Sequence, residues 1–148
     1  MISPDLIKSR VVKLVYEYWA IKAAGGLLPR RSDIRWEELR GLASYVGMVD
    51  VLKDPLRFRI RFFGTQLVQW AGRDYTGSVI DEGATGLERL VFDDYTYVIE
   101  TQQPRYDERS AAWPGRGYHR LERIVAPLSS DGKTVDMLFG AIDVHTPT

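Results

Sequence analysis

The spacing of apolar residues predicts a helix at the start of the chain. Ser3 can cap it, Pro4 fits its first position, and Gly25–Gly26 can end it. One apolar stripe at helical spacing comprises Ile7, Val11, Leu14, Tyr18 and Ile21, and a second comprises Val12, Val15 and Trp19. One stripe is enough to dock a helix on its own domain. We therefore expect the first stripe to form a homodimer interface, unless both stripes are buried within one molecule.

The pattern then changes to that of strands. Residues 57–62 alternate strictly, so that Phe58, Ile60 and Phe62 are expected on one face and Arg57, Arg59 and Arg61 on the other. Residues 46–53 read as the preceding strand. Three further antiparallel strands are expected at 106–113, 118–128 and 134–144, joined by the turns 114–117 and 130–133.

Helical patterns fill the remaining segments. A short helix is expected over 35–45, capped by Ser32 or Asp33, and another over 65–71. The glycine-rich stretch 73–86 reads as a loop, and 87–103 as a long helix ended by Pro104. Two strands, a helical block and three strands predict an α+β fold: a five-stranded antiparallel sheet with the block on one face. We divide the chain into an N-terminal amphipathic helix, 1–27, and a domain, 28–148.

Composition excludes several classes of function. Lys plus Arg and Asp plus Glu number 20 each, so a general DNA-binding protein or an anionic-membrane binder is not expected. The chain has no cysteine, which excludes disulfides, a thiolate nucleophile and cysteine-bound metals. We see no secretory signal and no apolar run that could span a membrane, so we expect a cytoplasmic protein.

Several short motifs occur in order between residues 10 and 145. They are Leu28-Pro29-Arg30-Arg31-Ser32-Asp33-Ile34, Arg61-Phe62-Phe63-Gly64-Thr65, Gly72-Arg73-Asp74-Tyr75-Thr76-Gly77, Glu122-Arg123, Pro127-Leu128, Asp131-Gly132 and Asp136-Met137-Leu138. Together with the order of elements, they resemble the small single-domain PAS-type proteins of bacteria. The resemblance implies a PAS-like sheet, and a sensory or scaffolding role rather than catalysis. It implies either a small ligand between sheet and helices, or none.

The residues test the cofactors that PAS domains carry. A cysteinyl-flavin adduct and a covalently linked chromophore each need a cysteine, which is absent. Haem needs an axial ligand, usually histidine, yet none lies between Gly64 and Pro104. Non-covalently bound flavin requires none of these residues, so it is not excluded, but no residue specifically supports it. His119 and His145 are expected to be separate surface residues rather than a metal site.

Charged residues give weaker signals. The carboxylate pairs at 81–82, 93–94 and 107–108 diverge on either helix or strand, so we expect solvated surface groups. The arginines of 57–61 and those at 116, 120 and 123 need water or acidic partners, and the helix 87–103 can supply carboxylates. An anionic partner is the less favoured alternative.

Aromatic residues mark the place where a PAS cavity forms. The candidate ligand-binding residues are Trp70, Tyr75, Phe92, Tyr95, Trp113 and Tyr118, with Tyr97 close to them in sequence. The same residues can also fill a core that contains no ligand.

Our hypothesis is a non-enzymatic signalling domain that acts in trans as a homodimer on an unidentified signalling protein. It binds either a small molecule or a protein partner. Two alternatives remain. One is a cone-shaped, isomerase-like α+β enzyme, which requires a buried carboxylate with a raised pKa. The other is a ligand-free interaction module.

Overall fold

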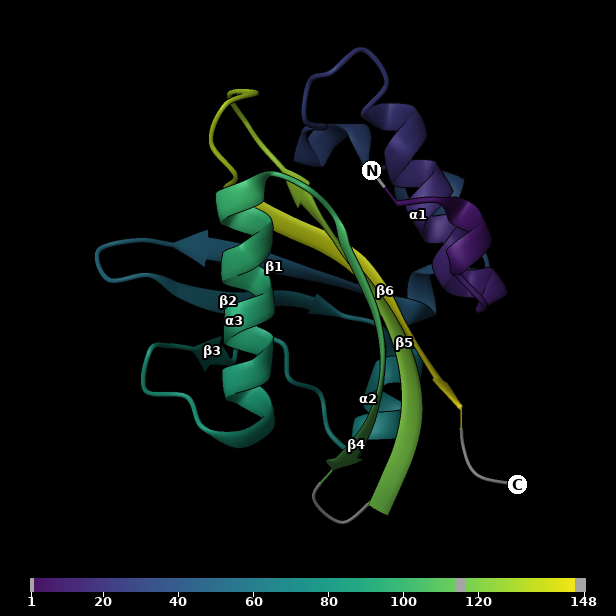
Figure 1. The fold of residues 1–148 in the computed structure, drawn as a ribbon, viewed down its shortest axis with the longest axis vertical. Helices are drawn as coiled ribbons and strands as arrows, with labels where there is room; N and C mark the ends of the chain where they lie inside the picture. The colour runs from purple at the N-terminus through teal and green to yellow at the C-terminus, as the bar shows by residue number, and fades with distance from the viewer. Residues whose placement is uncertain (1, 114–116, 146–148) are drawn as a thin grey trace.

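The strands form one antiparallel sheet in the order β3-β2-β1-β6-β5-β4 (Figure 1). The computed structural model of the chain describes residues 2–113 and 117–145, without the side chains of residues 111–119. The strands are β1 (Val46–Leu52), β2 (Arg57–Phe63), β3 (Val79–Ile80), β4 (Arg105–Trp113), β5 (Gly117–Leu128) and β6 (Met137–His145). The α+β class and the antiparallel sheet are confirmed.

The sheet has one strand more than the sequence predicts. β3 lies within the stretch 73–86, which the sequence assigns to a loop. Gly77 has a φ of 90°, which is open to glycine, and its N–H donates to the Ile60 carbonyl at 2.7 Å. The chain thereby turns back alongside β2 and adds two residues to the edge of the sheet.

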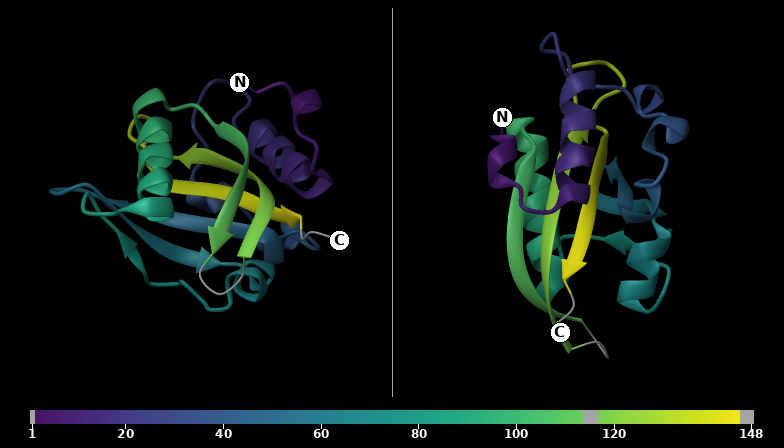
Figure 2. Two further views of the ribbon diagram at one scale, coloured as in Figure 1. Left: turned by 60° about the horizontal axis from the view of Figure 1, so that its bottom comes forward. Right: turned by 90° about the vertical axis from the view of Figure 1, so that its right-hand side faces the viewer.

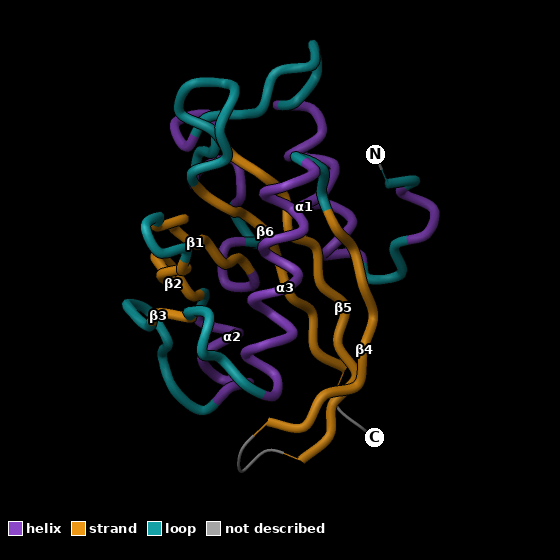
Figure 3. Tube along the Cα trace, turned by 60° about the vertical axis from the view of Figure 1, so that its left-hand side comes forward, coloured by secondary structure: helices purple, strands orange, loops and turns teal. Residues whose placement is uncertain are grey.

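The two long helices cover opposite faces of the sheet (Figure 2). The α-helices are α1 (Arg10–Lys22), α2 (Thr65–Ala71) and α3 (Gly86–Thr101); the 3-10 turns are η1 (Pro4–Leu6), η2 (Arg31–Asp33), η3 (Trp36–Leu39) and η4 (Ala43–Tyr45). Each face of the sheet therefore has its own hydrophobic core, one against α1 and one against α3. Successive residues of β5 point to opposite faces, so Ile124 packs in the core under α1 and Val125 in the core under α3. Figure 3 shows β4 along the edge beside β5.

The first helix begins six residues later than its sequence signals predict. Ser3 and Pro4 introduce the short turn η1, and Ser9 caps α1 by accepting the Val12 N–H at 3.2 Å. Residues 7–9 stay extended because the sheet binds their backbone. Ile7 is therefore not on the helix, and only 5% of it is exposed.

A buried carboxylate holds this extended segment. Glu122 of β5 accepts N–H groups from Lys8 at 3.1 Å and Ser9 at 2.8 Å, and the Tyr106 hydroxyl at 2.7 Å. Its other oxygen lies 2.8 Å from Nε2 of His145 at the end of β6. Burial alone would raise the pKa of Glu122, but its hydrogen bonds with Tyr106, His145 and Ser9 hold it below its usual value.

Two further sequence predictions are wrong in detail. The helix expected over 35–45 consists of η3 and η4, because Gly41 between them takes a φ of 84° and ends the first turn. In β2, the register shifts so that Met48 pairs with Phe62 and Val49 with Ile60. This bulge turns Phe62 to the α1 side, where its ring lies 4.7 Å from that of Trp36. Strict alternation therefore fails at Phe62.

Candidate functional site

A small cavity lies between α3 and the middle of the sheet. Its volume is about 40 Å³. Gly47 of β1 and Gly140 of β6 lie opposite each other, and because glycine has no side chain this pair leaves a gap between the flanking side chains of the two strands. The remaining lining residues include Val49, Tyr95, Arg123, Val125, Leu138 and Ile142. The walls are thus apolar, with Tyr95 and Arg123 as the polar side chains.

Aromatic rings close the space beside this cavity. Phe58 of β2 is fully buried and meets Phe92 at 5.4 Å and Tyr95 at 5.2 Å, both edge to face. Such pairs add about 0.5–1.5 kcal/mol each beyond their burial. Of the candidate ligand-binding residues, Phe92 and Tyr95 therefore pack directly against Phe58.

An ion-pair network joins α3 to β4 and β5. Asp94 of α3 contacts Arg123, Arg105 at 3.1 Å and Arg109 at 2.8 Å. Asp107 of β4 accepts from Arg109 at 2.7 Å and from Arg123 at 3.2 Å. Asp94 and Arg123 are both buried, with 7% and 6% exposed. Asp94 therefore ties α3 to the sheet, and Asp107 joins Arg109 of β4 to Arg123 of β5.

Burial and charge set the protonation of the groups at this site. Burial raises the pKa of the Tyr95 hydroxyl, against the opposing effect of Arg123. Burial opposes the charge on Arg123, but Asp107, Tyr95 and Asp94 outweigh it and raise the pKa of that guanidinium. At neutral pH, Tyr95 is a neutral donor and Arg123 a cation.

The candidate aromatic residues occupy different places. Phe92 and Tyr95 both contact Phe58, whereas Tyr75 meets Phe63 edge to face, with ring centroids 5.6 Å apart. Trp70 lies on α2. Tyr97 is 44% exposed and lies under Arg105, so it faces away from the cavity. Trp113 and Tyr118 have side chains outside the described residues.

Sequence reasoning missed the buried part of the network. It assigned the pair 93–94 to solvent, which is wrong for Asp94, because that side of α3 packs on β4 and β5. Its expectation that the acidic helix supplies partners for the arginines is confirmed at Arg123. The arginines of β2 pair differently: Arg59 and Arg61 both contact Asp50 of β1, at 3.0 and 3.3 Å.

The remaining sequence expectations concern metals and membranes. Among the described residues, no three histidine, aspartate or glutamate side chains are placed to hold a metal ion. His145 bonds to Glu122, and the side chain of His119 lies outside the described residues. The described part of the chain contains no helix with the length and apolar character to cross a bilayer.

Comparison with known proteins identifies a family. A family model described as "PAS domain" matches residues 7–143, which is nearly the whole chain. Comparison with curated proteins found no significant match.

Solved structures share the fold at low identity. The PAS domain of Bordetella pertussis BvgS matches with a TM-score of 0.55 and 18% identity, over 76% of this chain and 87% of that one. The Vibrio cholerae VqmA dimer matches with a TM-score of 0.56 and 14% identity, over 76% of this chain and 52% of that one. The Rhodobacter sphaeroides LOV protein matches with a TM-score of 0.52 and 7% identity, over 90% of this chain and 67% of that one. These likenesses establish the fold alone.

Proposed function

Because this chain belongs to the family of PAS domains, we propose that it is a signalling domain that acts as a homodimer and passes its state to a partner protein in trans. The observation that carries this proposal is the outer face of α1, defined by Arg10, Lys13, Leu14, Glu17 and Ile21. The opposite side of the helix packs on β5 and β6 through Val12, Val15, Tyr16 and Trp19.

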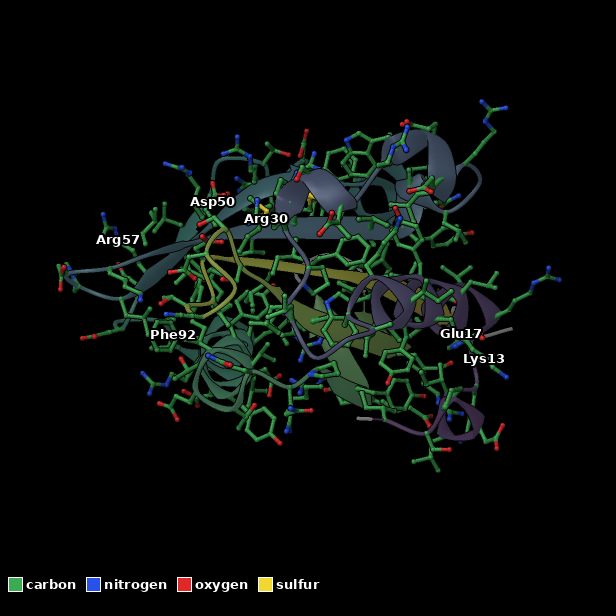
Figure 4. The ribbon with its side chains drawn as sticks, turned by 90° about the horizontal axis from the view of Figure 1, so that it is seen from above. Lys13, Glu17, Arg30, Asp50, Arg57 and Phe92 are labelled. Atoms are coloured by element: carbon green, nitrogen blue, oxygen red, sulfur yellow. The ribbon has the colours of Figure 1, made fainter. Side chains whose placement is uncertain are left out.

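The outer face of α1 combines exposed apolar side chains with charged side chains that have no ion-pair partner among the described residues. Ile21 is 72% exposed and Leu14 38%. Arg10, Lys13 and Glu17 form no ion pair with any other described residue. An open groove of about 450 Å³ borders the face and is lined by Ile2, Pro4, Tyr16, Glu17, Ala20, Ile21 and Ala24. Figure 4 places Lys13 and Glu17 together on α1, far from Phe92 on α3.

The stripe expected from the sequence changes in composition. Leu14 and Ile21 remain on the outer face of α1. Ile7 is buried and Val11 half-buried, while the Tyr18 hydroxyl donates to Glu38 at 2.8 Å. The proposed interface therefore centres on Leu14 and includes the charges on either side of it.

The order of charges favours an antiparallel pairing of two α1 helices. In a two-fold dimer with its axis level with residue 15, one position along the helix from Leu14, Lys13 of each protomer faces Glu17 of the other. The same contact then occurs twice. A parallel pairing would place Lys13 opposite Lys13 and Glu17 opposite Glu17, which is unfavourable.

The face of the sheet that α3 covers, called the inner face below, provides a route by which a change at α3 could reach α1. Asp94 ties α3 to β4 and β5, and β5 carries α1 on its other face. A displacement of α3 is therefore transmitted to the sheet beneath α1. A ligand or partner drives such a shift only if it binds the two arrangements unequally.

A flavin does not fit this inner face. One of the structural neighbours concerns a flavin analogue in a light-oxygen-voltage domain. Here the cavity is about 40 Å³, whereas pockets for cofactor-sized ligands measure about 300–1,000 Å³. Phe58, Phe92 and Tyr95 fill the intervening space.

The isomerase-like alternative finds no support at the buried carboxylates. That alternative needs a buried acid with a raised pKa. Hydrogen bonds hold the pKa of Glu122 low instead. Asp94 is engaged by three guanidiniums, and Asp50, the third buried carboxylate of the described residues, pairs with Arg59 and Arg61.

The experiment is sedimentation equilibrium on the wild type and matched leucine variants. Leu14→Asp should weaken the dimer at least about tenfold, because it places two carboxylates at the axis. Leu90→Asp is the control, since Leu90 is 52% exposed on α3. A monomeric wild type at high micromolar concentration, or equal effects of the two variants, would overturn the proposal.

A charge exchange tests the direction of pairing. Glu17→Lys alone should weaken the dimer, and adding Lys13→Glu should restore it, because the antiparallel contact is then remade with the charges reversed. If the double variant dimerises no better than Glu17→Lys alone, the antiparallel pairing is wrong.

A further inference from the structure

The hairpin of β1 and β2 presents arginine side chains on the face of the sheet that also carries α1. Asp50 of β1 lies opposite Arg59 of β2. Met48, two residues before Asp50, packs in the core under α1, so alternation along the strand directs Asp50 and Arg59 to that same face. Arg61 joins them there, because it contacts Asp50.

The positive charges of this hairpin outnumber its negative charges. Arg59 and Arg61 both contact the same oxygen of Asp50, at 3.0 and 3.3 Å. Arg57 donates to the carbonyl of the turn at residue 55, at 2.7 Å, and forms no ion pair with any other described residue. The charges of the two exposed residues 53 and 54, a lysine and an aspartate, cancel. The hairpin therefore keeps an excess of two positive charges.

These side chains are open to solvent. The side chain of Arg59 is 46% exposed and that of Arg61 57%. Val79 of β3 lies opposite Arg59 and is 48% exposed, so an apolar side chain borders the guanidiniums. Figure 4 shows Asp50 and Arg57 far from the labelled charges on α1. This surface is therefore separate from the proposed dimer interface.

The arrangement defines the chemistry of a partner. Guanidinium groups donate paired hydrogen bonds that match carboxylates. Alternate side chains of a strand lie about 6.6 Å apart, and those of an extended peptide have the same spacing. An extended segment with acidic residues at alternate positions therefore matches Arg57 and Arg59 along β2. A nucleic acid suits the surface less, because proteins that bind one carry a broad basic footprint, whereas this chain has 20 basic and 20 acidic residues.

We propose that this arginine surface, defined by Asp50, Arg57, Arg59, Arg61 and Val79, docks an extended acidic segment of the partner protein. The inference names the chemistry of the partner and so rests on the proposed signalling role. It does not require the dimer, because the surface lies within one protomer and away from the outer face of α1.

The test is fluorescence anisotropy at low salt with a labelled octapeptide in which glutamate and serine alternate. The expected result is saturable binding that weakens as salt is added. An octapeptide of the same composition with its glutamates in one block should bind at least about threefold more weakly, because half of its carboxylates then face away from the sheet. The proposal is refuted if no saturable binding occurs up to about 1 mM peptide, or if an oligouridylate of equal length binds as tightly.

A double variant removes two charges of the surface without exposing the buried carboxylate. Arg57→Gln with Arg61→Gln leaves Asp50 bound to Nε and a terminal nitrogen of Arg59, at 3.2 and 3.0 Å, so the fold should be retained. This variant should bind the alternating peptide about tenfold more weakly, or worse.

A matched control changes the net charge equally at another place. Arg89→Gln with Arg120→Gln removes two exposed arginines from α3 and β5, and should leave the affinity within about twofold. Equal losses in the two double variants would reduce binding to general charge attraction and overturn the proposal.

The monomerising variant Leu14→Asp separates this inference from the proposed dimer. It should bind the alternating peptide as the wild type does, and a loss of binding there would place the peptide at α1 instead. A dimeric wild type that does not bind the peptide contradicts only the docking surface. A monomeric wild type that binds it contradicts only the dimer.

Discussion

Asp94 offers the sharpest test of the packing between α3 and the sheet. Asp94→Asn keeps the shape of the side chain and removes its charge, while Arg105, Arg109 and Arg123 stay in place. Removing one partner of a buried ion pair costs about 3–5 kcal/mol, and here Arg109 and Arg123 would keep only Asp107 as an acidic partner. We expect Asp94→Asn to lower the free energy of unfolding by this amount.

The neighbouring residue supplies a matched control. Asp93 pairs with Arg89 at 3.2 Å on the solvent side of α3, with both side chains about half exposed. Asp93→Asn should therefore cost only about 0.3–0.5 kcal/mol. The two variants differ by one position on the same helix and carry the same chemical change.

Urea unfolding followed by tryptophan fluorescence measures both variants, since the chain contains four tryptophans. The slope against urea should stay constant, so that the shift in midpoint reports stability alone. Added salt should remove the effect of Asp93→Asn and leave that of Asp94→Asn. If the two variants differ by less than about 1 kcal/mol, Asp94 does not hold α3 on the sheet.

Two further expectations follow from local geometry. Gly140→Ala should cost at least about 3 kcal/mol or prevent folding, because its Cβ would lie 1.9 Å from the Ile124 carbonyl oxygen; a urea midpoint equal to that of Gly47→Ala would contradict this. The backbone N–H groups of Thr134 and Lys133 and the Ser129 hydroxyl lower the pKa of Asp131 from 3.8 to about 2. Its contribution to stability is thus present above pH 3.8 and lost as the pH falls through 2. Melting temperatures between pH 2 and 6 should show an acid limb that is shallower in Asp131→Asn, and an unchanged limb would refute the assignment.

Periodicity is enough to place five of the six strands that the structure describes and the two long helices, because burial on one face imposes it directly on the sequence. It could not locate the bulge in β2, since Arg61 and Phe62 continue the alternating pattern through the change of register. The start of α1 was missed for a similar reason. Ser3-Pro4 and Ser9 are both acceptable starts, and the choice depends on Glu122, more than a hundred residues away.

Some residues of the candidate site could likewise be identified from the sequence, and others could not. Phe92 and Tyr95 could be chosen because aromatic residues on a helix face are visible in the sequence. Asp94 could not be distinguished from Asp93, because only the rotation of α3 on the sheet decides which carboxylate is buried. The cavity itself depends on Gly47 and Gly140 being paired, which is a fact of strand register.

Glu122 has a consequence for the cooperativity of the fold. The segment before α1, strand β4 and the end of β6 all bond to its carboxylate. If any one of them detaches, a buried charge loses part of its solvation, so opening one segment raises the cost of keeping the others in place. Amide hydrogens of these three segments should accordingly exchange with solvent as one unit, with a shared opening free energy. In this respect the N-terminal helix belongs to the sheet that carries it, although it comes first in the sequence.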